Sequence, residues 1–295
     1  MPMRPDPVQA VIGVLLAAFL TACATSPESQ ERTLQAPDPI LQELASALPG
    51  HYVTPARAGG DERLELEVIA DPATSPGHLR LLMIQRRMDR PDDPPRQFEW
   101  RLETSHVDHD RLNGSFAPMD AAGRVQRRCH MQVSVRRDGL TSQTDPQECS
   151  FGEGERLTGL LKEIAFDGHQ LVIGDRLISL PRGEPLGDDQ VTRFMFSRRY
   201  TGWAGVRNGG DWRMASTISL QSGMGSIEPH DAAHMDLGLR VELNHYLMSR
   251  SDQVKLRLSV TDRETGKLLG ESWGDADAQS IGIALPGVQV GLEAD

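Results

Sequence analysis

Hydrophobic and polar residues alternate with a period of two along most of this chain beyond residue 60. The clearest runs are residues 64–68, 98–102, 131–135, 237–243 and 254–260. Side chains of a β-strand point alternately to its two faces, so each run predicts a strand with one buried and one solvated face. Clusters of Pro, Gly and Asp separate the runs, which favours antiparallel hairpins. The chain is therefore predicted to be mainly β, as a barrel or a sandwich.

Two shorter patterns refine this picture. Leu41, Leu44 and Leu48 recur at helical spacing, Asp38 can cap the start and Pro49-Gly50 can end it, which predicts a short amphipathic helix over residues 39–48. Hairpins are expected over residues 166–178 and residues 281–292, where apolar runs flank Asp-Gly or Pro-Gly turns.

A second β block begins near residue 200. Its alternating runs indicate about five more strands. They could form a small separate sandwich or extend the first sheet. We favour a distinct small β domain of residues 200–295, behind a first domain of residues 39–199.

The N-terminal segment has the order of a secretory signal: Arg4, an apolar stretch over residues 8–20, then small residues. Leu20-Thr-Ala-Cys23 also resembles the lipobox of bacterial lipoproteins. That resemblance implies that residues 1–22 are a lipoprotein signal peptide and that Cys23 is the lipidation site. A cleaved signal without lipid is the alternative, and a transmembrane helix would need about 20 apolar residues.

The residues after Cys23 bear on location. Residues 23–38 are rich in Pro, Ser and Gln and are expected to form a disordered tether. In the lipoproteins that the segment resembles, Asp after the cysteine favours the inner membrane, and Ala24 stands there instead. The expected place is the cell envelope, with the N-terminal lipid in the outer membrane and the folded part facing the periplasm. Two or three acyl chains suffice for stable anchoring.

Charge and cysteine content narrow the function classes. The formal net charge of −11 argues against nucleic acid as a partner and against adhesion to anionic lipid by charge. Cys129 and Cys149 are the two cysteines beyond Cys23, and an oxidising periplasm favours a disulfide between them. Two buried free thiols are the alternative.

Several landmarks in the first block occur in a recognisable order. They are Leu48-Pro-Gly-His-Tyr52 after the predicted helix, Pro94-Pro-Arg-Gln-Phe-Glu-Trp-Arg-Leu102, Cys129 and Cys149, and Asp188-Asp189 before Phe194-Met-Phe-Ser-Arg198. Together they resemble the T-type chromophore lyases of phycobiliproteins (the CpcT/CpeT family) over roughly residues 41–199.

The resemblance implies a calycin-like, lipocalin-like antiparallel barrel that holds an open-chain tetrapyrrole and presents it to a phycobiliprotein cysteine. Arg96, Gln97 and Arg101 align with motif positions of that family, whereas Phe98 and Trp100 replace an arginine and a tyrosine. These five residues are the implied ligand-binding set. The two replacements make a cavity more apolar and less suited to a dianionic bilin. Neither a catalytic residue nor a cofactor is implied for this chain.

Three functions remain open. The primary hypothesis is binding of an apolar, amphipathic or tetrapyrrole-like ligand without catalysis. The alternative is an envelope interaction or assembly protein without a small ligand, which meets a protein partner through residues 200–295. The second alternative is a bilin–phycobiliprotein lyase, although phycobiliproteins are assembled in the cytoplasm, away from an anchored periplasmic protein.

Possible metal ligands and arginine doublets also stand out in the sequence. Residues 106–110 and the pair His230 and His234 gather possible metal ligands, but the first set is typical of a solvated hairpin tip and neither predicts a metal site. Arginine doublets such as Arg86-Arg87 and Arg127-Arg128 place one side chain on each face of a strand. An inward arginine would meet an anionic ligand or pair with Glu99 or Glu103. The alternative is that both arginines of a doublet lie at the end of a strand and face water.

Overall fold

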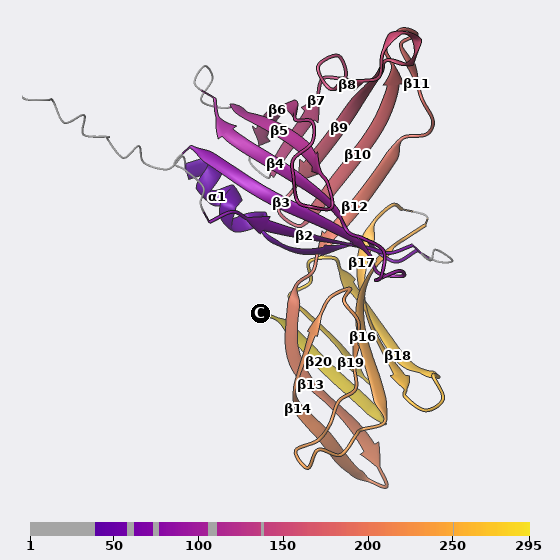
Figure 1. Ribbon diagram of the computed structural model, residues 1–295. Coiled ribbons are helices and arrows are strands. Elements are labelled where there is room, and N and C mark those ends of the chain that lie inside the picture. Colours follow the sequence, from indigo (N-terminus) through magenta and orange to yellow (C-terminus); the bar gives the residue numbers. More distant parts are fainter. Residues whose placement is uncertain (1–38, 58–61, 73–76, 106–110, 137–138, 250) are drawn as a thin grey trace, which may run out of the picture. The chain divides into compact units, whose positions relative to one another are not determined.

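The computed structural model describes residues 39–57, 62–72, 77–105, 111–136, 139–249 and 251–295, which lie within one compact unit, Ala36–Asp295. About 61% of the chain is strand, which confirms the mainly β class (Figure 1). The elements are α1 (Pro39–Ala47), β1 (Gly50–Val53), β2 (Leu64–Ala70), β3 (His78–Arg87), β4 (Arg96–Thr104), β5 (Arg111–Met119), β6 (Cys129–Arg136), β7 (Gly139–Thr144), β8 (Ser150–Phe151), η1 (Gly154–Arg156), β9 (Thr158–Phe166), β10 (Gln170–Ser179), β11 (Glu184–Pro185), β12 (Gln190–Phe196), β13 (Arg199–Asn208), β14 (Asp211–Gln221), β15 (Ser226–Ile227), β16 (Leu239–Leu247), β17 (Val254–Asp262), β18 (Leu268–Asp275), β19 (Ser280–Ala284) and β20 (Val288–Ala294).

The first twelve strands form one antiparallel sheet that closes on itself. The hydrogen-bonded order runs β10-β12-β1-β2-β3-β4-β5-β6-β7-β9, and β9 pairs back onto β10 from Thr158 with Ser179 to Phe166 with Leu171. The result is a closed ten-stranded barrel, with β8 and β11 as short additions. The predicted antiparallel barrel is confirmed.

The apolar residues of the alternating runs form the core of the barrel. Leu66, Trp100 and Met131 are each 0% exposed and represent the inward rows of β2, β4 and β6. Their polar neighbours in the sequence point to the other face, as the pleat of a strand requires. Removal of these apolar side chains from water is the main driving force for closing the sheet.

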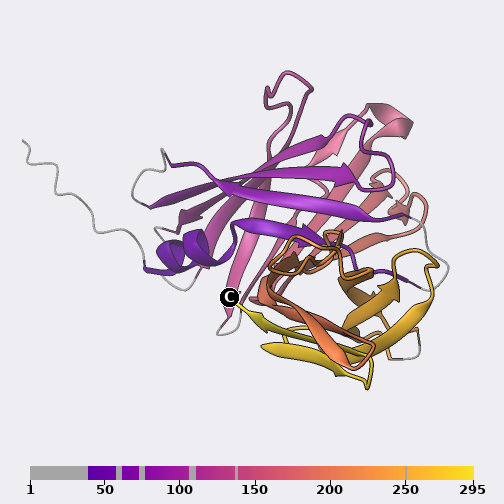
Figure 2. The same cartoon turned by 90° about the horizontal axis from the view of Figure 1, so that it is seen from below.

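The predicted helix is present as α1, Pro39–Ala47. Leu41 and Leu44 point from it into the buried cluster of the barrel, and α1 packs on β3 and β4 (Figures 1 and 2). The chain then turns into β1, where the buried Tyr52 hydroxyl donates a hydrogen bond to the carbonyl of Leu48 at 2.8 Å. Within the described ranges, no helix is long and apolar enough to cross a membrane.

The strands after Phe196 form two further four-stranded sheets, ordered β14-β13-β20-β19 and β15-β16-β17-β18. They enclose a second buried cluster that includes Val241, Leu256 and Val290. They are not an extension of the barrel sheet. The expected number of about five strands was too low, because eight are present. The three missed strands are β13 and β14, in which glycine or polar residues weaken the alternation, and β15, which is only two residues long. The proposed division at residue 200 stays a prediction.

The two cysteines lie together beside the barrel wall. Cys129 is the first residue of β6 and Cys149 directly precedes β8, both are buried, and they form a disulfide. This confirms the predicted pairing. A cross-link lowers the conformational entropy of the unfolded chain, so it should stabilise the folded state.

Reduction of this disulfide should lower the free energy of unfolding by about 3 kcal/mol, the chain-entropy value for a loop of this size. Urea denaturation with and without reductant measures the change. The double variant Cys129→Ser with Cys149→Ser is the control, because reductant should leave its midpoint unchanged. An equal reductant effect on both proteins would contradict the assignment.

His245 is an ionisable group inside the second cluster. It is 2% exposed, its Nε2 lies 3.2 Å from the carbonyl oxygen of Ala276, and its Nδ1 has no hydrogen-bond partner among the described residues. Burial disfavours the charged imidazolium and lowers the pKa of His245 to about 4.

The depressed pKa of His245 predicts a pH-dependent stability. Between pH 6.5 and pH 4 the unfolded chain binds a proton that the folded chain does not, so His245 destabilises the fold progressively as pH falls through that window. The expected loss is about 1–3 kcal/mol. Denaturation of His245→Gln should show a shallower decline than the native chain over this range, whereas His78→Gln, at an exposed histidine, should not. Parallel curves for His245→Gln and the native chain would refute the assignment.

Candidate functional site

The barrel contains a cavity of about 670 Å³ at one end. It lies next to the turn between β3 and β4, where Gln85 pairs with Arg96. Six apolar side chains form much of its wall: Leu64, Met83, Phe98, Phe116, Ile173 and Phe194. Charged and polar side chains surround them near the ends of the strands.

The inward row of β4 shows how the sequence produces this gradient. Arg96, Phe98 and Trp100 follow one another at every second position, so all three point to the barrel interior. Arg96 is exposed, Phe98 is half-buried, and Trp100 is fully buried. The row therefore leads from solvent through the cavity into the packed core.

A buried ion pair lies in the cavity wall. Lys162 of β9 is 4% exposed, and its Nζ donates a hydrogen bond to Oδ2 of Asp175, on β10, at 2.9 Å. The same Nζ lies 4.8 Å from the ring centroid of Phe116 and 5.4 Å from that of Phe98. The two rings stack with centroids 5.4 Å apart. The ammonium is thus held by a carboxylate and by two aromatic faces.

Burial is the main influence on the pKa of Lys162 and lowers it. The carboxylate of Asp175 opposes this effect, whereas the positive charge of Arg96 adds to it. Lys162 and Arg96 therefore act on each other as like charges in the same cavity.

The cations around the cavity differ in their partners. Arg86 pairs with Glu67 at 3.0 Å and Arg87 with Asp89 at 2.8 Å. Arg96 has no ion-pair or hydrogen-bond partner within the described part of the chain. It is the cavity's cation that is available to a ligand.

The structure separates the five ligand-binding residues expected from the resemblance. Arg96 and Phe98 line the cavity. Trp100 lies below it in the core, with an indole Nε1 that has no hydrogen-bond partner among the described residues. Gln97 and Arg101, at the intervening positions of β4, point to the outer face of the barrel. The set therefore does not converge on one site.

Lys162 and Asp175 were not among the expected site residues. A signal was available, because Lys162 occupies the same face of β9 as the buried Ile164 and Phe166. A lysine in an apolar row is a candidate for a functional charge. Asp175 continues the inward row of Leu171 and Ile173 in the same way.

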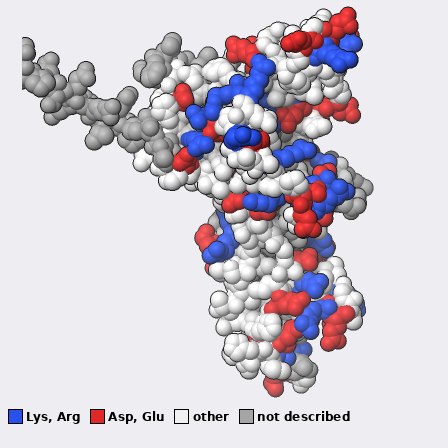
Figure 3. Space-filling model, in the orientation of Figure 1, with Lys and Arg blue, Asp and Glu red and all other residues white. Residues whose placement is uncertain are grey.

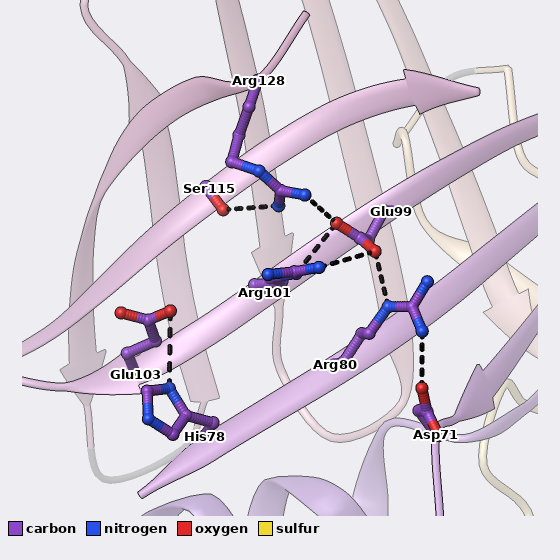
Figure 4. A network of polar contacts seen from close by, with 8 residues as sticks. All are labelled: Asp71, His78, Arg80, Glu99, Arg101, Glu103, Ser115 and Arg128. Carbon is purple, nitrogen blue, oxygen red and sulfur yellow. Dashed lines mark hydrogen bonds and ion pairs between the residues drawn. The ribbon is translucent and has the colours of Figure 1, made fainter. Parts of the chain in front are cut away.

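Arg101 belongs to an ion-pair cluster on the outer face of the barrel (Figure 4). Its centre is Glu99, which is 1% exposed. Arg80 Nε lies 2.5 Å from Glu99 Oε2, while Arg101 Nε and Arg128 Nη2 lie 2.9 Å and 2.5 Å from Oε1. The pairing expected for Glu99 is thus present, but outside the barrel.

The three guanidinium groups decide the charge of Glu99. Burial of the carboxyl raises its pKa, but the hydrogen bonds from Arg80, Arg101 and Arg128 outweigh burial and lower the pKa below its usual range. On the face of the molecule that Figure 3 shows, basic and acidic side chains are interspersed, without one large field of either sign.

The remaining metal-ligand candidates do not form a site in the described ranges, where no group of three or more potential ligands is found. His230 and His234 lie in a turn rather than a helix, and His230 Nδ1 is 2.9 Å from the carbonyl oxygen of Glu228. Residues 106–110, and Cys23 as well, fall outside the described residues.

No family model matches this chain, and no curated protein matches its sequence. The resemblance to the T-type chromophore lyases therefore stays a prediction.

Removal of the charge at the centre of the outer cluster tests its structural role. Glu99→Gln should lower the free energy of unfolding by about 1–3 kcal/mol, because three guanidinium groups lose their shared anion. Glu103→Gln is the matched control on the same face of β4, where Glu103 is 45% exposed, and it should change stability by less than about 0.5 kcal/mol. Urea denaturation at neutral pH measures both. Equal effects of the two variants would rule out a special role for Glu99.

Proposed function

We propose that this protein is a lipid-anchored envelope protein whose barrel binds an apolar or amphipathic small molecule without converting it. The observation that carries the proposal is the cavity of about 670 Å³ with its apolar wall and polar rim. Cavities that hold small ligands have this size. Here the apolar wall is combined with a larger number of charged and polar side chains, which suits a ligand that has a polar group beside its apolar part. The anchoring rests on the lipobox-like pattern at Cys23.

The width of the barrel favours an unfilled interior. Eight strands give an interior just wide enough to be filled by side chains or to hold one small ligand, and this barrel has ten strands. Core residues fill one part, while the half-buried Phe98 and, to a small extent, the 4% exposed Phe116 present ring surface to the open part. A ligand that covers these surfaces would gain about 25 cal/mol for each Å² of apolar area removed from water.

A second candidate function is supported by the C-terminal strands. Trp203, Trp212 and Met214 are each nearly 40% exposed on β13 and β14, and Trp273 of β18 is 44% exposed. Large exposed apolar side chains on a sheet are typical of surfaces that meet another protein. They support the alternative of an envelope interaction or assembly role for residues 200–295.

Cavity binding is tested with an uncharged fluorescent probe, N-phenyl-1-naphthylamine. The full chain carries Cys23→Ser, so that no lipid or detergent competes for the probe. Saturable fluorescence enhancement is expected, and Gln85→Trp, which fills the cavity beside Arg96, should weaken probe affinity at least about tenfold. Gln97→Trp places the same ring on the outer face of the adjacent strand and should leave affinity unchanged.

Two outcomes would overturn the proposed function. One is a probe signal that rises linearly, without saturation, with the chain that carries Cys23→Ser as its only substitution. The other is an equal loss of affinity in both tryptophan variants when circular dichroism shows that both are folded, because the probe would then bind somewhere other than the cavity.

A further inference from the structure

We propose that the barrel cavity is a site for an amphiphile with a single carboxylate, such as a fatty acid, whose carboxylate lies between Arg96 and Lys162 and whose chain covers Phe98 and Phe116. This inference rests on the proposed function and specifies the ligand class. It also gives a role in ligand binding to Lys162 and Asp175, which were not among the expected site residues.

The charged side chains of the cavity differ in whether they have a partner in the protein. Lys162 and Asp175 neutralise each other, and Arg86 and Arg87 have acidic partners outside the apolar wall. Four basic and four acidic side chains line the cavity, and Arg96, at its exposed end, is the basic one without an ion-pair or hydrogen-bond partner among the described residues. A guanidinium group binds a carboxylate through two parallel hydrogen bonds, which makes it well suited to this ligand group.

The position of Asp175 limits the ligand to one negative charge. Its side chain is 41% exposed, so it can stay hydrated when a ligand carboxylate approaches Lys162. Its own charge repels a second anionic group at the same place. A tetrapyrrole with two propionates, or a doubly charged phosphate, is therefore a poorer match than a monocarboxylate.

The aromatic pair supplies the surface for the apolar part. Phe98 and Phe116 stack with an interplanar angle of 28° and contact the Lys162 ammonium on the side of the cavity. The carboxylate position and the apolar surface are thus adjacent. An amphiphile needs this arrangement, because its charged and apolar parts are joined covalently.

The experiment compares dodecanoate with dodecan-1-ol at pH 8, as competitors for N-phenyl-1-naphthylamine on the full chain carrying Cys23→Ser. Dodecanoate should displace the probe at about tenfold lower concentration than the alcohol, because charge-assisted hydrogen bonds are stronger than neutral ones. Arg96→Gln should remove this preference, so that acid and alcohol displace the probe at similar concentrations. Arg101→Gln, on the outer face, should keep the preference.

A charge-conserving variant guards against loss of folding. Arg96→Lys keeps the positive charge at this position, so dodecanoate should still displace the probe at a lower concentration than the alcohol. Equal displacement by acid and alcohol, or no effect of Arg96→Gln on the preference, would overturn the inference and leave cavity binding intact. Probe binding that neither compound displaces would also overturn it. Absence of saturable probe binding would instead refute the proposed function.

Discussion

The ladder between β9 and β10 is the contact on which the barrel depends, because it joins the two ends of a long antiparallel sheet. Its nine paired positions satisfy the backbone groups that an open edge would leave to solvent or to another chain. Closure also fixes which residues face inward on every strand, since one slip in register would exchange the two faces. The site and the outer ion cluster both follow from this constraint.

Strand β4 shows how one strand serves both faces. Its inward row contributes Trp100 to the core and Phe98 and Arg96 to the cavity, while its outward row contributes Glu99 and Arg101 to the ion cluster. Charges are tolerated outside because each is paired or hydrated. Inside, an unpaired charge is found where the row reaches solvent, at Arg96.

The sequence was sufficient for the strands with strong alternation, for α1 and for the disulfide, since each has a local pattern with a physical cause. It was insufficient for β13, where glycines break the alternation, for β14, where polar residues do so, and for the two-residue β15, and so the C-terminal strand count was too low. The site was predicted in part. Arg96 and Phe98 line the cavity, but a motif read along the chain also included Gln97 and Arg101, which the pleat turns outward. Because side chains alternate between the two faces of a strand, an inward Phe98 already implies that Gln97 and Arg101 point outward. The meeting of Lys162 with Phe116 depends on closure of the sheet, which no local pattern encodes.

The buried Lys162–Asp175 pair is costly for stability alone. Transfer of the Lys162 ammonium out of water carries a desolvation penalty, and apolar residues of similar volume often stabilise a fold as well as a buried ion pair or better. Here the pair borders a cavity, so Asp175 keeps part of its hydration while Lys162 is enclosed by two aromatic rings. A lysine in this position contributes no more to packing than a leucine would. Its distinctive property is a positive charge in the wall of the cavity, and the proposed carboxylate site uses this charge.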